Sequence, residues 1–398
     1  MPAESATPDP GEELLERFLA ETHAAAPMEL PELVDRCATA LGLKRIVVYL
    51  VDIQQRQLVP LTDGMPGLAV DSTTGGRAYR SLDLRIEESE GGGLTAWLPL
   101  INGAERLGVL GISAPAIDPV RLRRCRMLAS VLAMAITSKR AYSDSLARYA
   151  RTERMELPAE MLRAFLPPRT IGSADALSTA VLEPAYEIGG DAYDHSLTRS
   201  SLHVDIFDSM GHDLAAGLTT AVVLAGCRAA RRNGGDLLEL VDTVDQALAR
   251  WLPDQYCTGI VTQLDLARGL FRWCNCGHPP PLLIRGHRVL SGELESSPQP
   301  PMGLGVRFCE TPRTVHETQL EPGDRVLLYT DGVVESRLGD RTEFGLDRFT
   351  DSIIRATAAG ELAPESLRRL IHSILDAHDN RLRDDATLLL VEWRPRHA

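Results

Sequence analysis

The chain has 398 residues, of which 44% are hydrophobic and 24% are charged, and its formal net charge is -13 at pH 7. The composition is typical of a soluble globular protein, and the length predicts two or three domains. The net negative charge argues against a nucleic-acid-binding surface over the whole chain. Arg121–Arg124 is a local basic stretch, but it lies in a helical pattern and is better explained as a solvated helix face.

The number and spacing of the cysteines and the sequence of the N-terminus indicate the cellular compartment in which the protein is expected. The seven cysteines are odd in number and scattered, so they do not predict a disulfide framework. Cys274, Cys276 and His278 lie close together, but their spacing is poor for zinc and no second ligand pair follows. No apolar run reaches the roughly 18 residues needed to span a bilayer. Because Met1–Glu13 lacks the features of a signal peptide, we expect a reduced, cytoplasmic protein without a membrane or nucleic-acid partner.

The first third of the chain alternates between helical and strand-like patterns. Residues 1 to about 10 are expected to lack structure. The segments that follow are helical Glu13–Leu43 with a break near Pro27–Pro31, strand Arg45–Val51, strand Gln57–Leu61, a hairpin of Trp97–Ile101 and Arg106–Ile112, and a long helix over Pro119–Arg154. Asn102-Gly103, between the two hairpin strands, is a strong turn signal.

This order of helix, strands and helix over residues 28–140 resembles a GAF domain, a small-molecule sensor fold. The resemblance rests on the order of the elements and on the hairpin Leu98-Pro99-Leu100 … Arg106-Leu107-Gly108-Val109-Leu110-Gly111-Ile112. Residues 1–27 would precede the domain as a tail and helix. The resemblance implies either a pocket for a small-molecule ligand or partner, or a fold used only for dimerisation. A homodimer is expected in both cases.

A helical linker is predicted between this domain and the rest of the chain. Tyr142–Phe165 continues the helical pattern, and Leu166-Pro167-Pro168 ends it because proline cannot continue a helix. Its charges and spaced apolar positions fit a signalling helix or short coiled coil, and they fit a solvated linker helix equally well. We therefore expect a linker over residues 141–172 and a second domain over residues 173–396.

From about Leu177 the pattern changes to short strands and paired helices. The predicted elements are a strand over 178–184, strand Ser201–Phe207, helices Leu214–Arg231 and Asp236–Trp251, a hairpin of Gly259–Asp265 and Leu270–Cys274, a hairpin of Leu282–Ile284 and Arg288–Leu290, and buried strands Arg325–Tyr329 and Ala386–Trp393. Strands flanked by paired helices in this order predict an α+β layered sandwich.

Aspartate recurs beside these strands at four well-separated places. They are Gly189-Gly190-Asp191-Ala192-Tyr193-Asp194, Asp208-Ser209-Met210-Gly211-His212, Asp331-Gly332 and Asp384-Asp385. An isolated Asp-Gly pair usually marks a turn, but carboxylates at strand ends can converge on one sheet edge. Their oxygens are ligands for hard cations, and grouped anions repel one another unless cations lie between them. Two divalent ions can activate a water and hold a phosphoryl oxygen, so the pattern predicts a two-metal phosphate-ester hydrolase.

Five motifs over about 220 residues, in the same order, resemble the metal-dependent serine/threonine phosphatase family (PPM), in its bacterial SpoIIE-like or RsbU-like branch. The motifs are Glu187-Ile188-Gly189-Gly190-Asp191-Ala192-Tyr193-Asp194, Asp208-Ser209-Met210-Gly211-His212, Cys274-Asn275-Cys276-Gly277-His278-Pro279-Pro280-Pro281, Leu320-Glu321-Pro322-Gly323-Asp324 with Leu328-Tyr329-Thr330-Asp331-Gly332-Val333-Val334-Glu335, and Arg383-Asp384-Asp385-Ala386-Thr387.

The resemblance implies an αββα sandwich with two Mn²⁺ or Mg²⁺ ions in its cleft. Asp208 would bridge the ions, with the Ser209 carbonyl as a further ligand. Asp331 and Asp384 would complete one shell, and Asp191 would act at its edge, directly or through water. These four aspartates are the candidate catalytic residues.

Other residues of the motifs are weaker candidates. Asp385 is the poorer ligand of its pair, and both Asp194 and Asp385 are open to purely structural roles. Asn275 and His278 are expected to shape the site, with His278 in a hairpin turn.

Three positions depart from the family pattern. Phe207 and Asp213 stand where the family usually has glycine, and Cys276 stands where it has alanine. None of these departures removes a carboxylate. Phe207 and Asp213 nevertheless raise the question of whether the backbone geometry and the metal affinity are preserved.

The resemblance implies a signal-regulated protein phosphatase. Its substrate would be phosphoserine or phosphothreonine on an anti-sigma-factor antagonist, and metal-bound water would attack phosphorus directly. One alternative is a catalytically weak or inactive pseudophosphatase that acts as a sensory binding or scaffold module. Another is a hydrolase for a small phosphate ester.

Overall fold

The computed structural model describes residues 10–395 apart from 90–91, 188, 212, 298, 306–311, 335–350, 352, 356–357, 379–381 and 383. The predicted unstructured tail and the motif residues Ile188, His212, Glu335 and Arg383 therefore lie outside the described residues. The chain divides into two compact units, Met1–Glu153 and Arg154–Ala398. The division falls within the segment expected to be a linker.

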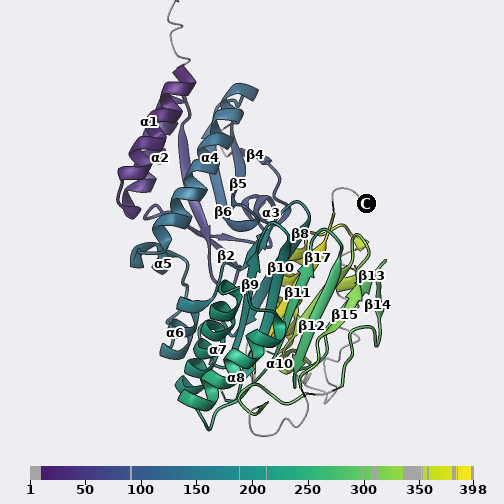
Figure 1. The fold of residues 1–398 in the computed structure, drawn as a ribbon. Helices are drawn as coiled ribbons and strands as arrows, with labels where there is room; N and C mark the ends of the chain where they lie inside the picture. The colour runs from purple at the N-terminus through teal and green to yellow at the C-terminus, as the bar shows by residue number, and fades with distance from the viewer. Residues whose placement is uncertain are drawn as a thin grey trace, which may run out of the picture. The chain divides into compact units, whose positions relative to one another are not determined.

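The first unit is a six-stranded antiparallel sheet with helices on both faces (Figure 1). Its elements are α1 (Pro10–Ala24), η1 (Pro27–Glu29), α2 (Leu30–Ala40), β1 (Arg45–Val51), β2 (Gln57–Pro60), β3 (Leu68–Ala69), α3 (Thr74–Ser81), β4 (Arg85–Ser89), β5 (Gly93–Asn102), β6 (Glu105–Ala114), α4 (Pro119–Arg140) and α5 (Asp144–Tyr149). The strand order is β3-β2-β1-β6-β5-β4. The predicted β5–β6 hairpin is confirmed, with Gly103 at φ 61° in its turn.

Side chains alternate across this sheet, as the period of a strand requires. In β1, Ile46 and Val48 enter the core shared with α2 and α4, whereas Tyr49 enters the core under α3. On the α3 side Tyr49 packs against Trp97, with ring centroids 5.6 Å apart. A Cβ on Gly111 would lie 2.8 Å from the Trp97 ring, so this side is filled by the unit's own residues.

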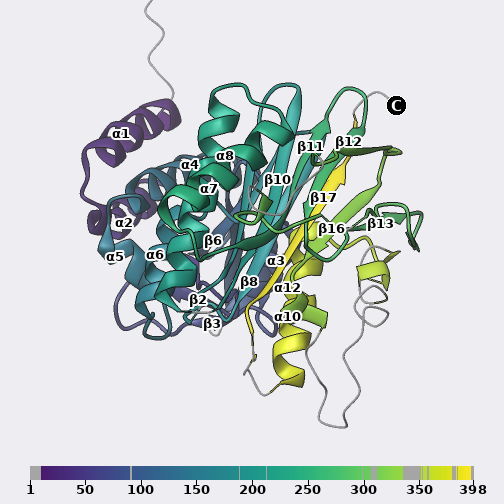
Figure 2. The ribbon, with the colours of Figure 1, turned by 60° about the horizontal axis from the view of Figure 1, so that its bottom comes forward.

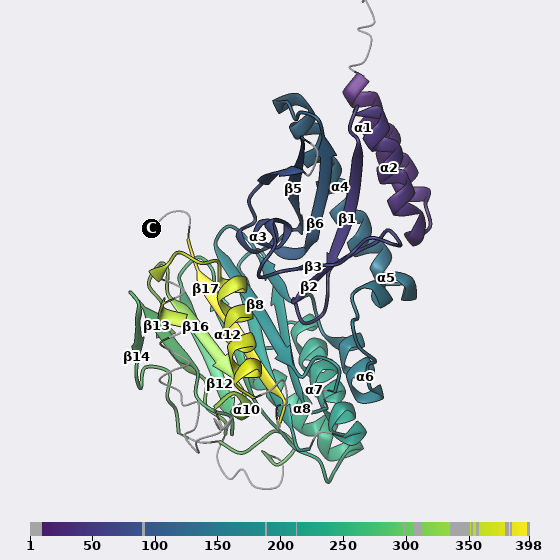
Figure 3. The ribbon, with the colours of Figure 1, turned by 180° about the vertical axis from the view of Figure 1, so that it is seen from behind.

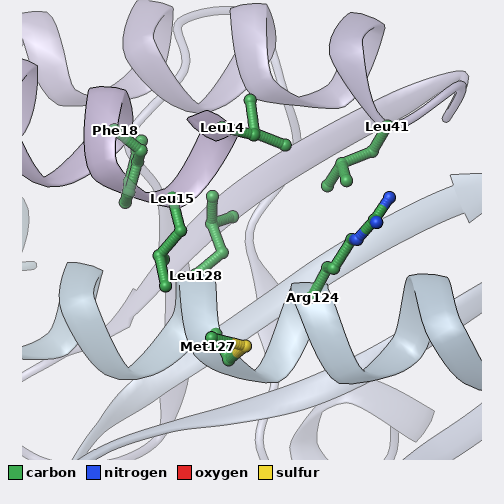
Figure 4. A pocket seen from close by; sticks show the side chains of 7 residues that line it. All are labelled: Leu14, Leu15, Phe18, Leu41, Arg124, Met127 and Leu128. Carbon is green, nitrogen blue, oxygen red and sulfur yellow. The ribbon is translucent and has the colours of Figure 1, made fainter. Parts of the chain in front are cut away.

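The α1–α4 side carries one small apolar pocket, shown in Figure 4. Its lining side chains come from α1, the end of α2 and α4: Leu14, Leu15, Phe18, Leu41, Arg124, Met127 and Leu128. The volume of about 20 Å³ is room for roughly one water molecule.

The continuous helices predicted over Pro119–Arg154 and Tyr142–Phe165 are wrong. Helix α4 ends at Arg140, and two short helices follow, α5 in the first unit and α6 (Leu157–Phe165) in the second. Ser143 is in an extended conformation and caps α5 through its hydroxyl. Glu156, the N-cap of α6, is also extended, and Pro158 lies in the first turn of α6, where proline is tolerated.

The second unit contains two antiparallel sheets with helices outside them. Its elements are α6, β7 (Thr170–Gly172), β8 (Ala176–Glu183), β9 (Asp191–Leu197), β10 (Ser201–Ser209), α7 (Leu214–Arg232), α8 (Leu237–Trp251), β11 (Cys257–Asp265), β12 (Leu270–Cys276), β13 (Leu282–Arg285), β14 (Arg288–Leu290), β15 (His316–Gln319), β16 (Arg325–Tyr329), α10 (Asp331–Val334), α12 (Ala363–Ala377) and β17 (Ala386–Trp393). The sheets run β15-β12-β11-β10-β9 and β14-β13-β16-β17-β8-β7.

The layers follow the predicted αββα order (Figures 2 and 3). Helices α7 and α8 pack on β10 and β11, and α12 packs on β8 and β17. The two sheets face each other across a single apolar core. The strands and helices predicted from Leu177 onward are confirmed, whereas β7, β9, β15, α10 and α12 were not predicted.

Helix α7 is the one described helix that is long and apolar enough to cross a membrane by length and composition. Its apolar side chains include Val223 and Leu224, which are fully buried in the core of the second unit. The six described cysteines are all unbonded and buried.

Candidate functional site

Two of the predicted aspartates are cross-strand neighbours. In the antiparallel β9–β10 pair, Asp208 lies opposite Asp191, and Ser209 ends β10. Gly190, just before β9, approaches this strand end closely, because a Cβ on it would lie 2.5 Å from the carbonyl oxygen of Gly211. The first two acidic motifs are therefore joined through backbone that only glycine permits.

The other two motifs meet at the end of the second sheet. Strands β16 and β17 pair up to Tyr329 and Leu388, and the amide of Thr330 continues the ladder to Thr387. Asp331 follows at the start of α10, and Asp384 and Asp385 precede β17. A Cβ on Gly332 would lie 2.0 Å from the backbone oxygen of Asp385, so the third and fourth motifs are in direct backbone contact.

Asp385 joins the two sheets by holding backbone. Its Oδ2 accepts hydrogen bonds from the amides of Gly189, Gly190 and Asp191, at 3.0, 2.8 and 3.2 Å. A carboxylate that accepts three amide bonds fixes the path of the chain into β9. This contact agrees with the expectation that Asp385 is a poorer metal ligand than Asp384 and has a structural role.

Asp191 makes a second link between the sheets. Its Oδ2 accepts hydrogen bonds from the hydroxyls of Thr330 and Thr387, at 2.7 and 2.8 Å. The side chain is 2% exposed. Burial, with the nearby charges of Asp208 and Asp385, raises the pKa of Asp191 well above its usual value.

The carboxylates crowd one another. Burial, together with the charges of Asp331, Asp384 and Asp385, raises the pKa of Asp208 to about 7. Burial also raises the pKa of Asp385, although three amide bonds oppose the shift. Among the described residues, no three acidic, histidine or cysteine side chains already stand around one point as metal ligands. The site is thus an acidic edge whose side chains are close enough to repel one another.

Helix α7 is anchored to this edge. Thr220 Oγ1 lies 2.6 Å from the Gly190 carbonyl and 2.7 Å from Ser209 Oγ. A Cβ on Gly217, one turn earlier, would lie 3.3 Å from the carbonyl oxygen of Gly189. The position of α7 therefore helps to fix the loop that precedes Asp191.

Phe207 does not crowd the acidic edge. It is fully buried in the core, and alternation along β10 puts it on the sheet face opposite to Asp208. Its cross-strand neighbours are Ala192 and Gly259, and a Cβ on Gly259 would lie 2.8 Å from the Phe207 ring. Small neighbours thus accommodate the ring.

Asp213 is the N-cap of α7. Its Oδ1 accepts hydrogen bonds from the amides of Ala215 and Ala216, at 2.9 and 3.0 Å. A helix N-terminus favours a negatively charged acceptor at this position. The second departure from the family pattern is therefore a helix cap.

Asp213→Ala should lower the free energy of unfolding by about 1 kcal/mol, because two amides lose their acceptor. Asp213→Asn keeps an oxygen there and should remain close to wild type. Urea denaturation of the three proteins measures the difference. Equal stabilities for the alanine variant and wild type would contradict the capping role.

Asn275 and His278 form a turn that braces the sheets. The Asn275 side chain exchanges two hydrogen bonds with the backbone of His278, both 2.8 Å. His278 Nε2 donates to the Tyr329 carbonyl, and Nδ1 lies 3.1 Å from the Thr258 hydroxyl. Burial lowers the pKa of His278 to about 4, so the ring is neutral. These contacts agree with a shaping role.

Asp194 also has a structural contact. It is 1% exposed and pairs with Arg228 at 2.7 Å and with Arg231 at 2.5 Å, both on α7. Its carboxylate belongs to the packing of α7 on β9.

The structure gathers Asp191, Asp208, Ser209, Asp331 and Asp384 at one edge, where the two sheets meet. Pattern reasoning did not find the hydroxyl groups of Thr330, Thr387 and Thr220. The sequence does show that Thr330 and Thr387 lie beside the strand-end aspartates, and this position is the one sign that they belong to the site. Their partners lie far away in sequence, so no local pattern identifies their role.

Comparison with known proteins matches this part of the chain. Residues 198–394 match the family described as Stage II sporulation protein E (SpoIIE). Phosphoserine phosphatase RsbP of Bacillus subtilis (strain 168) is 26% identical over 155 residues, covering 37% of this chain and 37% of that protein. Phosphoserine phosphatase RsbU of the same organism is 22% identical over 215 residues, covering 53% of this chain and 62% of that protein.

A solved structure shows the same fold. The SiaA-PP2C domain of Pseudomonas aeruginosa matches with a TM-score of 0.50 and 21% identity, over 59% of this chain and 94% of that chain. The chain spans less than two thirds of the length of the two curated relatives. Residues 198–394 therefore form a domain of the SpoIIE family, with the fold of a PP2C phosphatase domain.

Proposed function

We propose that the chain is a metal-dependent serine/threonine protein phosphatase, with its centre at the acidic edge. The observation that carries the proposal is the crowding of Asp208 by Asp331 and Asp384 at the meeting point of the two sheets. Carboxylates that raise one another's pKa hold their negative charge more readily when a divalent cation lies among them.

The donor set fits Mn²⁺ or Mg²⁺, because both ions prefer oxygen ligands. Asp208, Asp331 and Asp384, with the Ser209 carbonyl, would hold two ions. When bound, the ions would supply an activated water and charge stabilisation for the phosphoryl group. Asp191 belongs to the same edge, and its proposed role is to act on the ligand shell directly or through water.

The chain's own residues hold the edge in place. Asp385 fixes the backbone before β9, and Thr330 and Thr387 orient the Asp191 carboxylate. Preorganised groups of this kind cost no rearrangement when the phosphate ester binds.

We propose that the substrate is a phosphoserine or phosphothreonine protein, in the manner suggested by the names of RsbP and RsbU. An anti-sigma-factor antagonist fits this class of regulator, and a cytoplasmic location follows from such a partner.

The first unit is proposed to be a GAF-like regulatory domain. Its α3 side is filled by Tyr49 and Trp97, which favours a role in dimerisation over a ligand pocket there. Val120, Met127 and Met134 on α4 are 52%, 43% and 54% exposed. These three residues recur at intervals of seven, as in a helix–helix seam, and support a homodimer through α4.

One observation favours a catalytically weak chain that acts as a scaffold. The described residues contain no group of three side chains already arranged as metal ligands. A binding module would need none, whereas an enzyme would have to draw Asp208, Asp331 and Asp384 together.

Phosphate release from a phosphoserine peptide decides between these functions. The full chain should release phosphate with Mn²⁺ or Mg²⁺ and should stop when the ions are chelated. Asp331→Asn and Asp384→Asn should each lose activity by about a hundredfold, because each removes a charged ligand.

Asp242→Asn, on the exposed side of α8, removes the same charge away from the edge and should leave the rate unchanged. A wild-type chain with no turnover on phosphopeptides and p-nitrophenyl phosphate with either ion would support the scaffold. Turnover of p-nitrophenyl phosphate alone would indicate a small-molecule hydrolase.

A further inference from the structure

A pocket of about 750 Å³ opens in the second unit, at the end of α7 away from the acidic edge. The last two turns of α7 contribute Arg228, Arg231 and Arg232 to its lining. The β9–β10 hairpin contributes the hydroxyls of Ser196 and Ser200. The volume is within the range of pockets that hold small molecules.

The pocket has an excess of positive charge in a chain of net charge -13. Asp194 lies in the lining, but both of its oxygens are taken by Arg228 and Arg231. Arg231 also pairs with the buried Asp205 at 2.9 Å. Three guanidinium groups thus face two carboxylates, and the remaining charge is positive.

Hydrogen-bond donors also remain. Arg228 uses Nε and Nη2 for Asp194 and the Phe165 carbonyl, and its Nη1 forms no hydrogen bond with any residue that the structure describes. Arg232 is exposed and forms no ion pair with any described residue. Because Arg228 is already held by its ion pair, it would lose little further entropy on binding. A guanidinium group can also donate two parallel hydrogen bonds to the oxygens of one phosphate.

We propose that this pocket binds a small molecule that carries a phosphate or pyrophosphate group. The bound group would accept hydrogen bonds from Arg228 and Arg232 and from the serine hydroxyls of the hairpin. The site is separate from the acidic edge, which repels anions in the absence of metal.

Calorimetric titration of sodium pyrophosphate into the full chain tests the proposal. The buffer contains a chelator and little salt, so that no divalent ion carries pyrophosphate to the acidic edge. Saturable binding of one pyrophosphate per chain is expected. Arg232→Glu should weaken it by about tenfold or more, since a charge-assisted contact is lost and a repulsive one gained.

Arg199→Glu is the matched control. Arg199 is exposed on the same hairpin but does not line the pocket, so pyrophosphate affinity should change by about twofold at most. The absence of saturable heat, or equal weakening in both variants, would overturn the proposal. Tighter binding in Asp208→Asn, which removes a repelling charge from the acidic edge, would place the anion there and would overturn the proposal as well.

Discussion

Asp208→Asn should abolish metal-dependent phosphatase activity and at the same time stabilise the metal-free chain at pH 8. The loss of a charged ligand is expected to lower the rate by about a thousandfold, or several kcal/mol of transition-state stabilisation. The gain in stability follows from the burial of the Asp208 carboxylate and from its crowding by the other carboxylates at the edge. Residues that create a charged site commonly lower the stability of the fold.

The sign of the pH dependence follows from the raised pKa. Asp208 has a pKa of about 7 in the folded chain, against about 3.9 in an unfolded one. Between these values the folded chain binds more protons, so the free energy of unfolding falls as pH rises. Above pH 7 Asp208 is ionised in the folded chain, and its charge lowers the free energy of unfolding by the full amount. The asparagine variant lacks it and should be more stable there, by on the order of 2 kcal/mol.

Urea denaturation with a chelator at pH 8 and near pH 4 measures this difference. The variant's advantage should shrink toward pH 4, where Asp208 is largely protonated in the folded chain. Mn²⁺ should stabilise wild type at pH 8 and the variant much less, because only wild type keeps the full ligand charge. Asp242→Asn should show neither effect. A variant less stable than wild type at pH 8 would contradict an unfavourable charge, through burial and repulsion, at Asp208.

The acidic edge could be predicted from sequence because its signals are local. Asp208 and Asp331 each follow a run of strand-forming residues, and Asp384 precedes another. Their order resembles one family, and the family match of residues 198–394 agrees with it. The two sheets and the paired helices follow from the same alternation of apolar residues.

The links that hold the edge together could not be predicted. Thr330 contacts Asp191 across 139 positions of the chain, and no periodic pattern describes such a pair. The accommodation of Phe207 likewise depends on Gly259 in a neighbouring strand. The break between α5 and α6 was also missed, because apolar spacing alone continued through Ser143 and Pro158.

Substitution of Asp385 should have the second large effect on activity and stability. It tests whether Asp385 acts as a clamp, which holds the backbone through three amide hydrogen bonds, or as a metal ligand. Asp385→Ala leaves the amides of Gly189, Gly190 and Asp191 without their acceptor. Unsatisfied buried donors cost about 1–3 kcal/mol each, less where water enters. The free energy of unfolding should therefore fall by about 3 kcal/mol. The rate should fall by about a hundredfold, because Asp191 loses its position.

Asp385→Asn resolves the role, because asparagine keeps an oxygen in the same place and removes only the charge. If Asp385 acts only by accepting the three backbone hydrogen bonds, the oxygen is what matters. Asp385→Asn should then keep its activity within about tenfold of wild type and most of the stability that Asp385→Ala loses. A metal ligand needs the charge, so a ligand role predicts that Asp385→Asn fails as completely as Asp208→Asn. Phosphate release and urea denaturation of Asp385→Ala, Asp385→Asn and Asp208→Asn at one Mn²⁺ concentration distinguish the two. Equal loss of rate in the two asparagine variants would make Asp385 a ligand and the three amide bonds secondary to it.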